Sequence, residues 1–138
     1  MLFSALALTS SAVMAIMPAI AEEFGPEGVT AEQVASVLRD EGYKALIGTD
    51  DIGEPMIETA LSGLKVFIYF YECENEKCTD IQFSVAWDFE DGVPIRKIAE
   101  WNETNRFGKA FLDEERDPVL DIDLQLAPGG TPALIAAY

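Results

Sequence analysis

The chain has no histidine among its 138 residues. Without an imidazole, a Ser-His-Asp triad, a His-ligated zinc site and the commonest general base are all excluded. P-loops, Gly-x-Gly-x-x-Gly turns and Cys-x-x-Cys pairs are missing as well. Positive charge is scarce, with 9 Lys and Arg against 25 Asp and Glu and a net charge of −16. Such an acidic chain repels nucleic acid and anionic lipid, so neither is an expected partner.

The motifs that remain for chemistry are weak. Ser62-Gly63-Leu64-Lys65 matches S-x-x-K, in which a lysine activates a serine, but it lies at an expected hairpin turn rather than at a helix start. Acid pairs such as Asp50-Asp51 and Asp113-Glu114 do not have the spacing of a calcium loop, and solvated loop acids are the simpler interpretation. The sequence therefore predicts a protein that is not an enzyme and that uses no cofactor and no metal.

Charge is also absent from the first 21 residues. The segment 1–21 is apolar and ends in Ala19-Ile20-Ala21, which is typical of a signal-peptidase site. The basic residues that usually open a signal peptide are missing, since the first one is Arg39. An uncleaved anchor is the alternative, because about 20 apolar residues can span a bilayer. We expect a signal peptide over 1–21, a periplasmic or secreted protein of the Gram-negative type, and no membrane attachment after cleavage.

The rest of the chain has room for one domain. Residues 22–29 are expected to form a flexible leader and residues 30–138 the domain, an α+β fold in which helices pack on an antiparallel sheet. Patterning predicts one helix, four strands, one helix, two strands and a short third helix. The expected helices cover 31–41, 91–105 and the residues after Thr131, and the expected strands cover 43–48, 56–61, 64–71, 81–88, 107–112 and 119–126.

Helix starts give the clearest local signals. Thr30 with Gln33 three residues later predicts a capping box at the first helix. Thr131-Pro132 predicts a cap and first residue for the third helix, which has only Ala133 to Tyr138 left to form it. The third helix is therefore expected to be very short.

The only two cysteines flank four polar residues between two β-prone runs. Across a hairpin tip, Cys73 and Cys78 would lie within the separation that a disulfide needs. The oxidising compartment of an exported protein would let this disulfide form. A redox or metal pair and free thiols are the alternatives. The glutamates on either side of Cys73 disfavour a thiolate, so we expect a structural disulfide that contributes on the order of 2 kcal/mol.

The strand 64–71 is apolar on both faces. Val66, Ile68 and Phe70 alternate with an aromatic set, which consists of Phe67, Tyr69 and Tyr71. Helices are expected to cover one face. Either the bent sheet or the leader covers the other, or a partner or a second copy docks there, where Tyr and Phe are enriched. The candidate partner-binding residues are Phe67, Tyr69, Tyr71 and Trp101.

Trp101-Asn102, the run Arg106-Phe107-Gly108-Lys109-Ala110 and the strand 119–124 together resemble the YbjN domain family over about residues 29–130. The tip from Cys73 to Cys78 is similar to that of exported members. The resemblance implies a fold like that of type III secretion chaperones, an α+β sandwich that often forms dimers and grips segments of other proteins. It implies no reaction, and the short third helix weakens the expectation of a homodimer.

The resulting hypothesis is a non-enzymatic interaction or regulatory module of the cell envelope that recognises a polypeptide in a chaperone-like way. The alternative is a periplasmic protein that binds a small molecule or a metal. A hydrolase with carboxylate chemistry is a distant third, because it would need a concave pocket ringed by acids of raised pKa.

Overall fold

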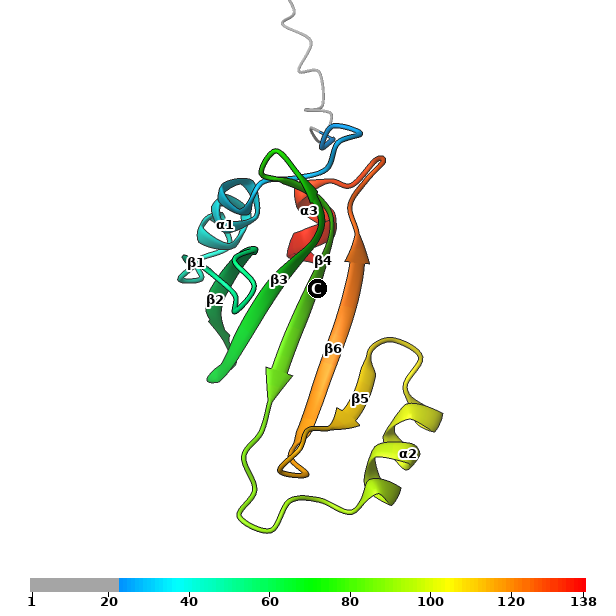
Figure 1. Ribbon diagram of the computed structural model, residues 1–138. Helices are drawn as coiled ribbons and strands as arrows, with labels where there is room; N and C mark the ends of the chain where they lie inside the picture. The colour runs from blue at the N-terminus through cyan, green and yellow to red at the C-terminus, as the bar shows by residue number, and fades with distance from the viewer. Residues whose placement is uncertain (1–22) are drawn as a thin grey trace, which may run out of the picture.

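The computed structural model describes residues 23–138, so the expected signal peptide over 1–21 lies outside the described residues. One helix, four strands, a helix, two strands and a short helix follow one another in the predicted order (Figure 1). The fold class is α+β, as predicted. The elements are α1 (Ala31–Asp40), β1 (Leu46–Thr49), β2 (Pro55–Leu61), β3 (Leu64–Glu74), β4 (Lys77–Ala86), α2 (Ile95–Thr104), β5 (Lys109–Leu112), β6 (Pro118–Gln125) and α3 (Pro132–Ala136).

The strands form one antiparallel sheet in the order β1-β2-β3-β4-β6-β5. α1 contacts α3, β1 and β2, whereas α2 contacts β5. Figure 1 shows α1 and α3 close to the end of the sheet where β3 turns into β4, and α2 beside β5 near the opposite end. The helices therefore cover two separate parts of the sheet.

The core lies between α1, α3 and one side of the sheet, here called the inner face. Val34 and Leu38 of α1 pack in one cluster with Ile57, Ile68 and Phe70 of the strands. Because side chains alternate along a strand, the residues between the buried ones point to the other side, here called the outer face. The buried stripe of α1 thus meets the apolar positions of β2 and β3.

The predicted capping box of α1 is present. The hydroxyl of Thr30 accepts a hydrogen bond from the backbone N–H of Gln33 at 3.2 Å, and the Gln33 side chain accepts one from the Thr30 N–H at 2.9 Å. The cap of α3 is also present, since Thr131 accepts from the N–H of Leu134. Local chemistry was sufficient to predict both helix starts.

The central hairpin is longer than predicted. β3 continues to Glu74, and the turn contains only Asn75 and Glu76, both with positive φ. Two such residues form a turn whose twist matches that of the strands it joins, so pairing continues almost to the tip. As a result Cys73 and Cys78 lie opposite each other within the strand ladder, rather than in a four-residue loop.

Outside this hairpin, two boundaries were wrong by three residues or more. β1 begins at Leu46 instead of Tyr43, because the N–H of Tyr43 bonds back to the carbonyl of Leu38 at the end of α1. α2 begins at Ile95 instead of near Asp91, because Pro94 has extended backbone angles and serves as the N-cap.

The expected leader is in contact with the fold over its described part. Val29 is fully buried and pairs with Cys78 in a β-bridge, and Phe24 bonds to the carbonyl of Gly130. Glu27 forms an ion pair with Lys77 at 2.6 Å, which lowers the pKa of that carboxyl. The segment from Phe24 to Val29 therefore packs against the hairpin tip.

Candidate functional site

The outer face carries three aromatic side chains of β3. Phe67 and Tyr69 are half-buried, and Tyr71 is 45% exposed. The rings of Phe67 and Tyr69 lie 6.1 Å apart between their centroids, and the Lys65 ammonium lies 5.8 Å from the centre of the Phe67 ring. Their inner-face neighbours Val66, Ile68 and Phe70 are buried, so the predicted division of this strand into two apolar faces is confirmed.

Hydrogen bonds connect Tyr71 to a carboxylate across the sheet through Gln82. The Tyr71 hydroxyl donates to Gln82 at 3.2 Å, and the Gln82 amide donates to Asp123 at 2.7 Å. Two residues further along β4, the Ser84 hydroxyl donates to Asp121 at 2.7 Å. The outer face therefore presents aromatic rings on β3, hydrogen-bonding side chains on β4 and acids on β6.

Asp121 is unusual on this face because only 6% of it is exposed. Its carboxylate accepts a hydrogen bond from Ser84 and lies 3.9 Å from the Lys109 ammonium. The same ammonium lies 5.3 Å from the centre of the Phe111 ring. A carboxylate taken out of water has to be paired or hydrogen-bonded. The Ser84 hydroxyl and Lys109 fulfil this need from the two strands that flank β6.

The two tyrosines have raised pKa values. Partial burial is the main cause for both Tyr69 and Tyr71, and the negative charge of Asp121 is the second cause. Asp50, in the turn between β1 and β2, adds to the effect at both rings, because nearby carboxylates disfavour a phenolate. Both hydroxyls are therefore neutral donors at physiological pH.

Trp101, the fourth candidate residue, lies on a different surface. It is part of α2 and lines an apolar cleft of about 320 Å³ between that helix and the sheet, together with Trp87, Ile98 and Leu120. Leu120 alternates with Asp121 along β6 and so points to the inner face. The structure therefore brings Phe67, Tyr69 and Tyr71 together and leaves Trp101 apart from them.

Asn102 has a role that sequence reasoning missed. Its side-chain amide donates to the carbonyl of Ala110 at 3.0 Å and accepts from the N–H of Ala110 at 3.0 Å. Ala110 is at the centre of β5, the last strand of the sheet, so the amide replaces the neighbouring strand that this residue lacks. The Trp-Asn pair gave a motif for comparison, but nothing in its spacing indicated this contact.

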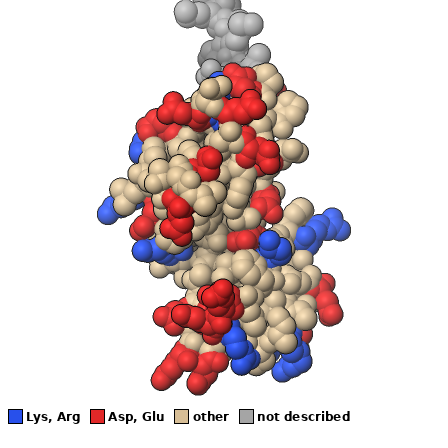
Figure 2. Space-filling view, viewed as in Figure 1, with Lys and Arg blue, Asp and Glu red and all other residues tan. Residues whose placement is uncertain are grey.

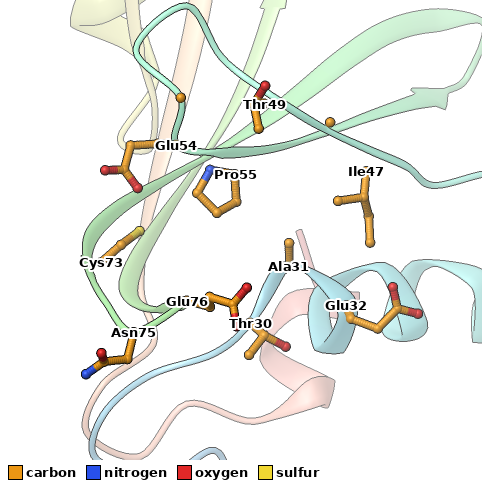
Figure 3. A pocket seen from close by; sticks show the side chains of 12 residues that line it. Thr30, Ala31, Glu32, Ile47, Thr49, Glu54, Pro55, Cys73, Asn75 and Glu76 are labelled. Carbon is orange, nitrogen blue, oxygen red and sulfur yellow. The ribbon is translucent and has the colours of Figure 1, made fainter.

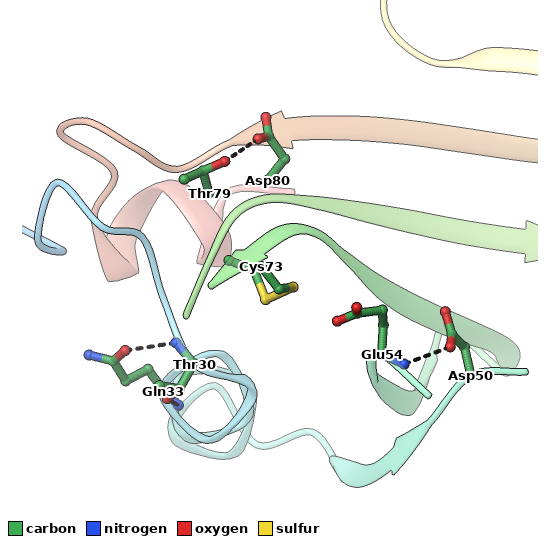
Figure 4. Close-up of a disulfide and its surroundings, with 8 residues drawn as sticks. Thr30, Gln33, Asp50, Glu54, Cys73, Thr79 and Asp80 are labelled. Atoms are coloured by element: carbon green, nitrogen blue, oxygen red, sulfur yellow. Dashed lines mark hydrogen bonds between the residues drawn. A yellow bond between two sulfur atoms is a disulfide. The ribbon is translucent and has the colours of Figure 1, made fainter. Parts of the chain in front are cut away.

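Cys73 and Cys78 form a disulfide, which closes the hairpin tip next to the N terminus of α1 (Figure 4). Cys78 is fully buried against the core, while Cys73 is partly buried. Ser62 of the S-x-x-K motif lies with Gly63 in the tight turn between β2 and β3, both with positive φ. That turn provides no helix start of the kind the motif requires.

A second hollow lies at the β1 side of the sheet. It has a volume of about 710 Å³ and opens between the N terminus of α1, the turn from β1 to β2 and the disulfide tip (Figure 3). Ala31, Ile47 and Pro55 contribute apolar walls, and Glu54 and Glu76 contribute carboxylates. Within residues 23–138, no group of three or more His, Cys, Asp or Glu side chains is placed to hold a metal ion. No helix of the described part is long and apolar enough to cross a membrane.

These observations define an α+β domain with helices on one face of an antiparallel sheet and an aromatic, carboxylate-lined opposite face. The model of the YbjN family, described as "putative bacterial sensory transduction regulator", matches residues 30–138. The chain belongs to this family. No curated protein and no solved structure matches it. The family description is that of a regulator and names no reaction, which supports a regulatory, non-enzymatic role.

Proposed function

We propose that this domain is a regulatory module of the cell envelope that binds a segment of a partner polypeptide on the outer face of its sheet. The observation that carries the proposal is the row formed by Phe67, Tyr69 and Tyr71 along β3, on the side of the sheet opposite α1 and α3. Tyrosine and phenylalanine combine large contact area with low side-chain entropy, which is why interfaces are enriched in them.

The chemistry of the outer face suits a polypeptide better than a small molecule. None of the three aromatic side chains lines the hollows beside α1, α2, α3 or the β5–β6 hairpin, whereas small ligands usually bind in concave sites. Gln82, Ser84 and Asp123 offer hydrogen-bonding groups next to the rings. A surface that alternates aromatic and hydrogen-bonding groups matches the side chains and backbone of an extended peptide.

The envelope location is the second part of this proposal. It is supported by the signal-like segment 1–21 and by the disulfide, which persists in an oxidising compartment. Cell fractionation with a C-terminal tag tests it. Recovery of the tagged protein in the periplasm, with the N terminus of the mature protein at Glu22, is the expected result. Recovery in the cytosol with reduced cysteines would contradict the envelope location.

Photo-crosslinking in living cells tests polypeptide binding. A benzophenone amino acid replaces Tyr71 in the full chain, and in a separate variant it replaces Tyr43, which is exposed to a similar extent, 43%, and lines a hollow with inner-face residues. We expect one polypeptide to be crosslinked from position 71 and not from position 43. Tyr69→Ala should abolish that crosslink, while Tyr43→Ala should leave it intact.

The same experiment has two outcomes that would contradict the proposal. Equal crosslinking from positions 71 and 43 would mean that the contacts are non-specific. Crosslinking that persists in the Tyr69→Ala variant would mean that the aromatic row does not hold the partner. Circular dichroism of each variant checks that a loss reflects the surface and not unfolding.

A small apolar molecule is the second candidate ligand, and the cleft beneath α2 favours it. The cleft is lined by two tryptophans, Trp87 and Trp101, and by Phe89, Val93 and Ile98. An apolar fluorescent probe such as ANS tests it. Binding that is lost in Trp101→Ala and retained in Tyr69→Ala would favour the small-molecule function.

A further inference from the structure

The two edges of the sheet differ in how they are protected. At the β5 edge, the Asn102 side chain occupies both backbone groups of Ala110, and α2 lies along the strand. Beyond the end of β5, the part of β6 from residue 122 to 125 pairs with β4 on one side and has no strand on its other side among residues 23–138, but it carries Asp123. Covering elements and charged side chains are common protections of sheet edges against strand addition.

The β1 edge is less protected within residues 23–138. α1 contacts β1, and the Arg39 side chain donates a hydrogen bond at 3.1 Å to the carbonyl of Ala45, the residue before the strand. All four residues of β1 are exposed, with Leu46 at 64%, and the strand contains no charged residue and no proline. β1 pairs with β2 on one side only, and no hydrogen bond from another part of the described chain reaches the backbone of Leu46 to Thr49 on the other side. In Figure 1, β1 lies at the outside of the sheet. An uncharged, unpaired edge strand is a template for one more strand.

The hollow of about 710 Å³ lies directly beside this edge, since Ile47, Gly48 and Thr49 of β1 form part of its lining. Its apolar walls include Ala31, Pro55 and Cys73, as Figure 3 shows. A side chain that projects from a strand added to β1 therefore has a hollow to enter.

The charges of the hollow specify the side chain that fits. Glu54 and Glu76 have no ion-pair partner among residues 23–138, whereas Glu32 is bound by Arg39 at 2.7 Å. Carboxylates also gather over this end of the molecule in Figure 2. Lysine and arginine match such a hollow, because their aliphatic stems cover apolar walls and their charged heads reach carboxylates.

An anion does not fit the same place. The hollow includes the N terminus of α1, whose free N–H groups would attract negative charge. The Thr30 hydroxyl already accepts from the N–H of Gln33, and Glu32 places a carboxylate in the first turn of the helix. The glutamates then leave the hollow with net negative charge.

We propose that β1 is a docking edge to which an extended, basic segment of a partner polypeptide adds as a further strand, with a lysine or arginine side chain in the hollow beside Glu54 and Glu76. This goes beyond the proposed function, because the edge and the aromatic outer face are separate surfaces. A second copy of this chain is not the occupant, since a net charge of −16 on each copy opposes self-association.

A random-peptide phage library tests the proposal on protein purified after expression of the full chain. We expect the selected peptides to be enriched in Lys and Arg between β-branched residues. Glu54→Lys combined with Glu76→Lys should weaken a selected peptide by about tenfold or more, since two attractive charges become repulsive. Glu103→Lys combined with Glu114→Lys makes the same change in net charge at two exposed acids that have no ion-pair partner in the described part of the chain. This control should change the affinity much less.

Amide hydrogen exchange then locates the bound peptide. We expect exchange to slow in Leu46 to Thr49, and we expect Tyr69→Ala to leave peptide binding unchanged. The proposal is overturned if the library yields no binder, if selected peptides lack basic residues, or if the charge reversal has no larger effect than its control. Peptides that lose binding in Tyr69→Ala, and do not slow exchange in β1, would also overturn it while leaving the outer-face proposal intact.

Discussion

Replacing Asn102 with alanine removes the side chain that closes the β5 edge. Two hydrogen bonds to the backbone of Ala110, each 3.0 Å long, are lost, and no other hydrogen bond of the Asn102 side chain is recorded in residues 23–138. The N–H and the carbonyl of Ala110, on an edge strand, then lose their partner and have to be solvated by water. The strand and the helix that contacts it lose their main polar connection.

The expected loss of unfolding free energy combines the two lost hydrogen bonds with the change in helix propensity at position 102. Each hydrogen bond contributes about 0.5–1.5 kcal/mol, toward the lower end at an exposed site. Alanine returns up to about 0.7 kcal/mol, because it favours the interior of a helix more than asparagine does. We therefore expect Asn102→Ala to lower the free energy of unfolding by about 0.3–1 kcal/mol.

Urea unfolding followed by circular dichroism measures this change, since a shift of the midpoint at constant slope reports stability. Glu103→Ala is the matched control, because Glu103 is the next residue of α2, is exposed and has no ion pair in the described part of the chain. Hydrogen exchange at the Ala110 amide should also accelerate in Asn102→Ala and not in the control. If both variants unfold at the same urea concentration, the reasoning about the β5 edge is refuted.

Three further predictions concern the hairpin and the outer face. Replacing both Cys73 and Cys78 with alanine should lower the free energy of unfolding by about 2 kcal/mol in urea titrations, by the loop-entropy estimate for so short a loop. The double variant should then be as stable as wild-type protein whose disulfide has been reduced. Gly28→Ala should destabilise the protein by at least about 1–2 kcal/mol, because Gly28 has a φ of +92° and a Cβ there would lie 2.1 Å from the carbonyl oxygen of Cys78; unchanged thermal unfolding would contradict this. The raised pKa values of Tyr69 and Tyr71 mean that the folded protein keeps both phenolic protons at a pH where the unfolded chain loses them. Stability is therefore fully present below pH 10 and falls as the pH rises above it, and Tyr69→Phe should reduce that fall in alkaline urea titrations.

Sequence patterning predicted the elements because their signals are local. The capping box at Thr30 and the alternation along β3 depend on residues three or two positions apart, and both were confirmed. The central hairpin was also predicted, but the predicted turn was longer than the two-residue turn in the structure. The positive φ values of Asn75 and Glu76 that allow the two-residue turn depend on pairing between the strands, which a residue pattern does not contain.

The candidate site was predicted only in part, for a similar reason. Period-two alternation was enough to place Phe67, Tyr69 and Tyr71 on one face, but the position of Trp101 relative to them depends on how α2 packs against β5. The contact between Asn102 and Ala110 joins residues of two different elements, so no periodicity reports it.

The sequence by itself determined the acidic charge, the lack of imidazole chemistry, the order of helices and strands and the two-sided character of β3. Composition and short-range periodicity carry this information directly. Only the tertiary structure decided that α1 and α3 cover the inner face, that Asn102 closes one edge and that β1 leaves the other open beside a hollow. Those features depend on strand order and on contacts between residues far apart in the chain, which the energy of the whole fold selects.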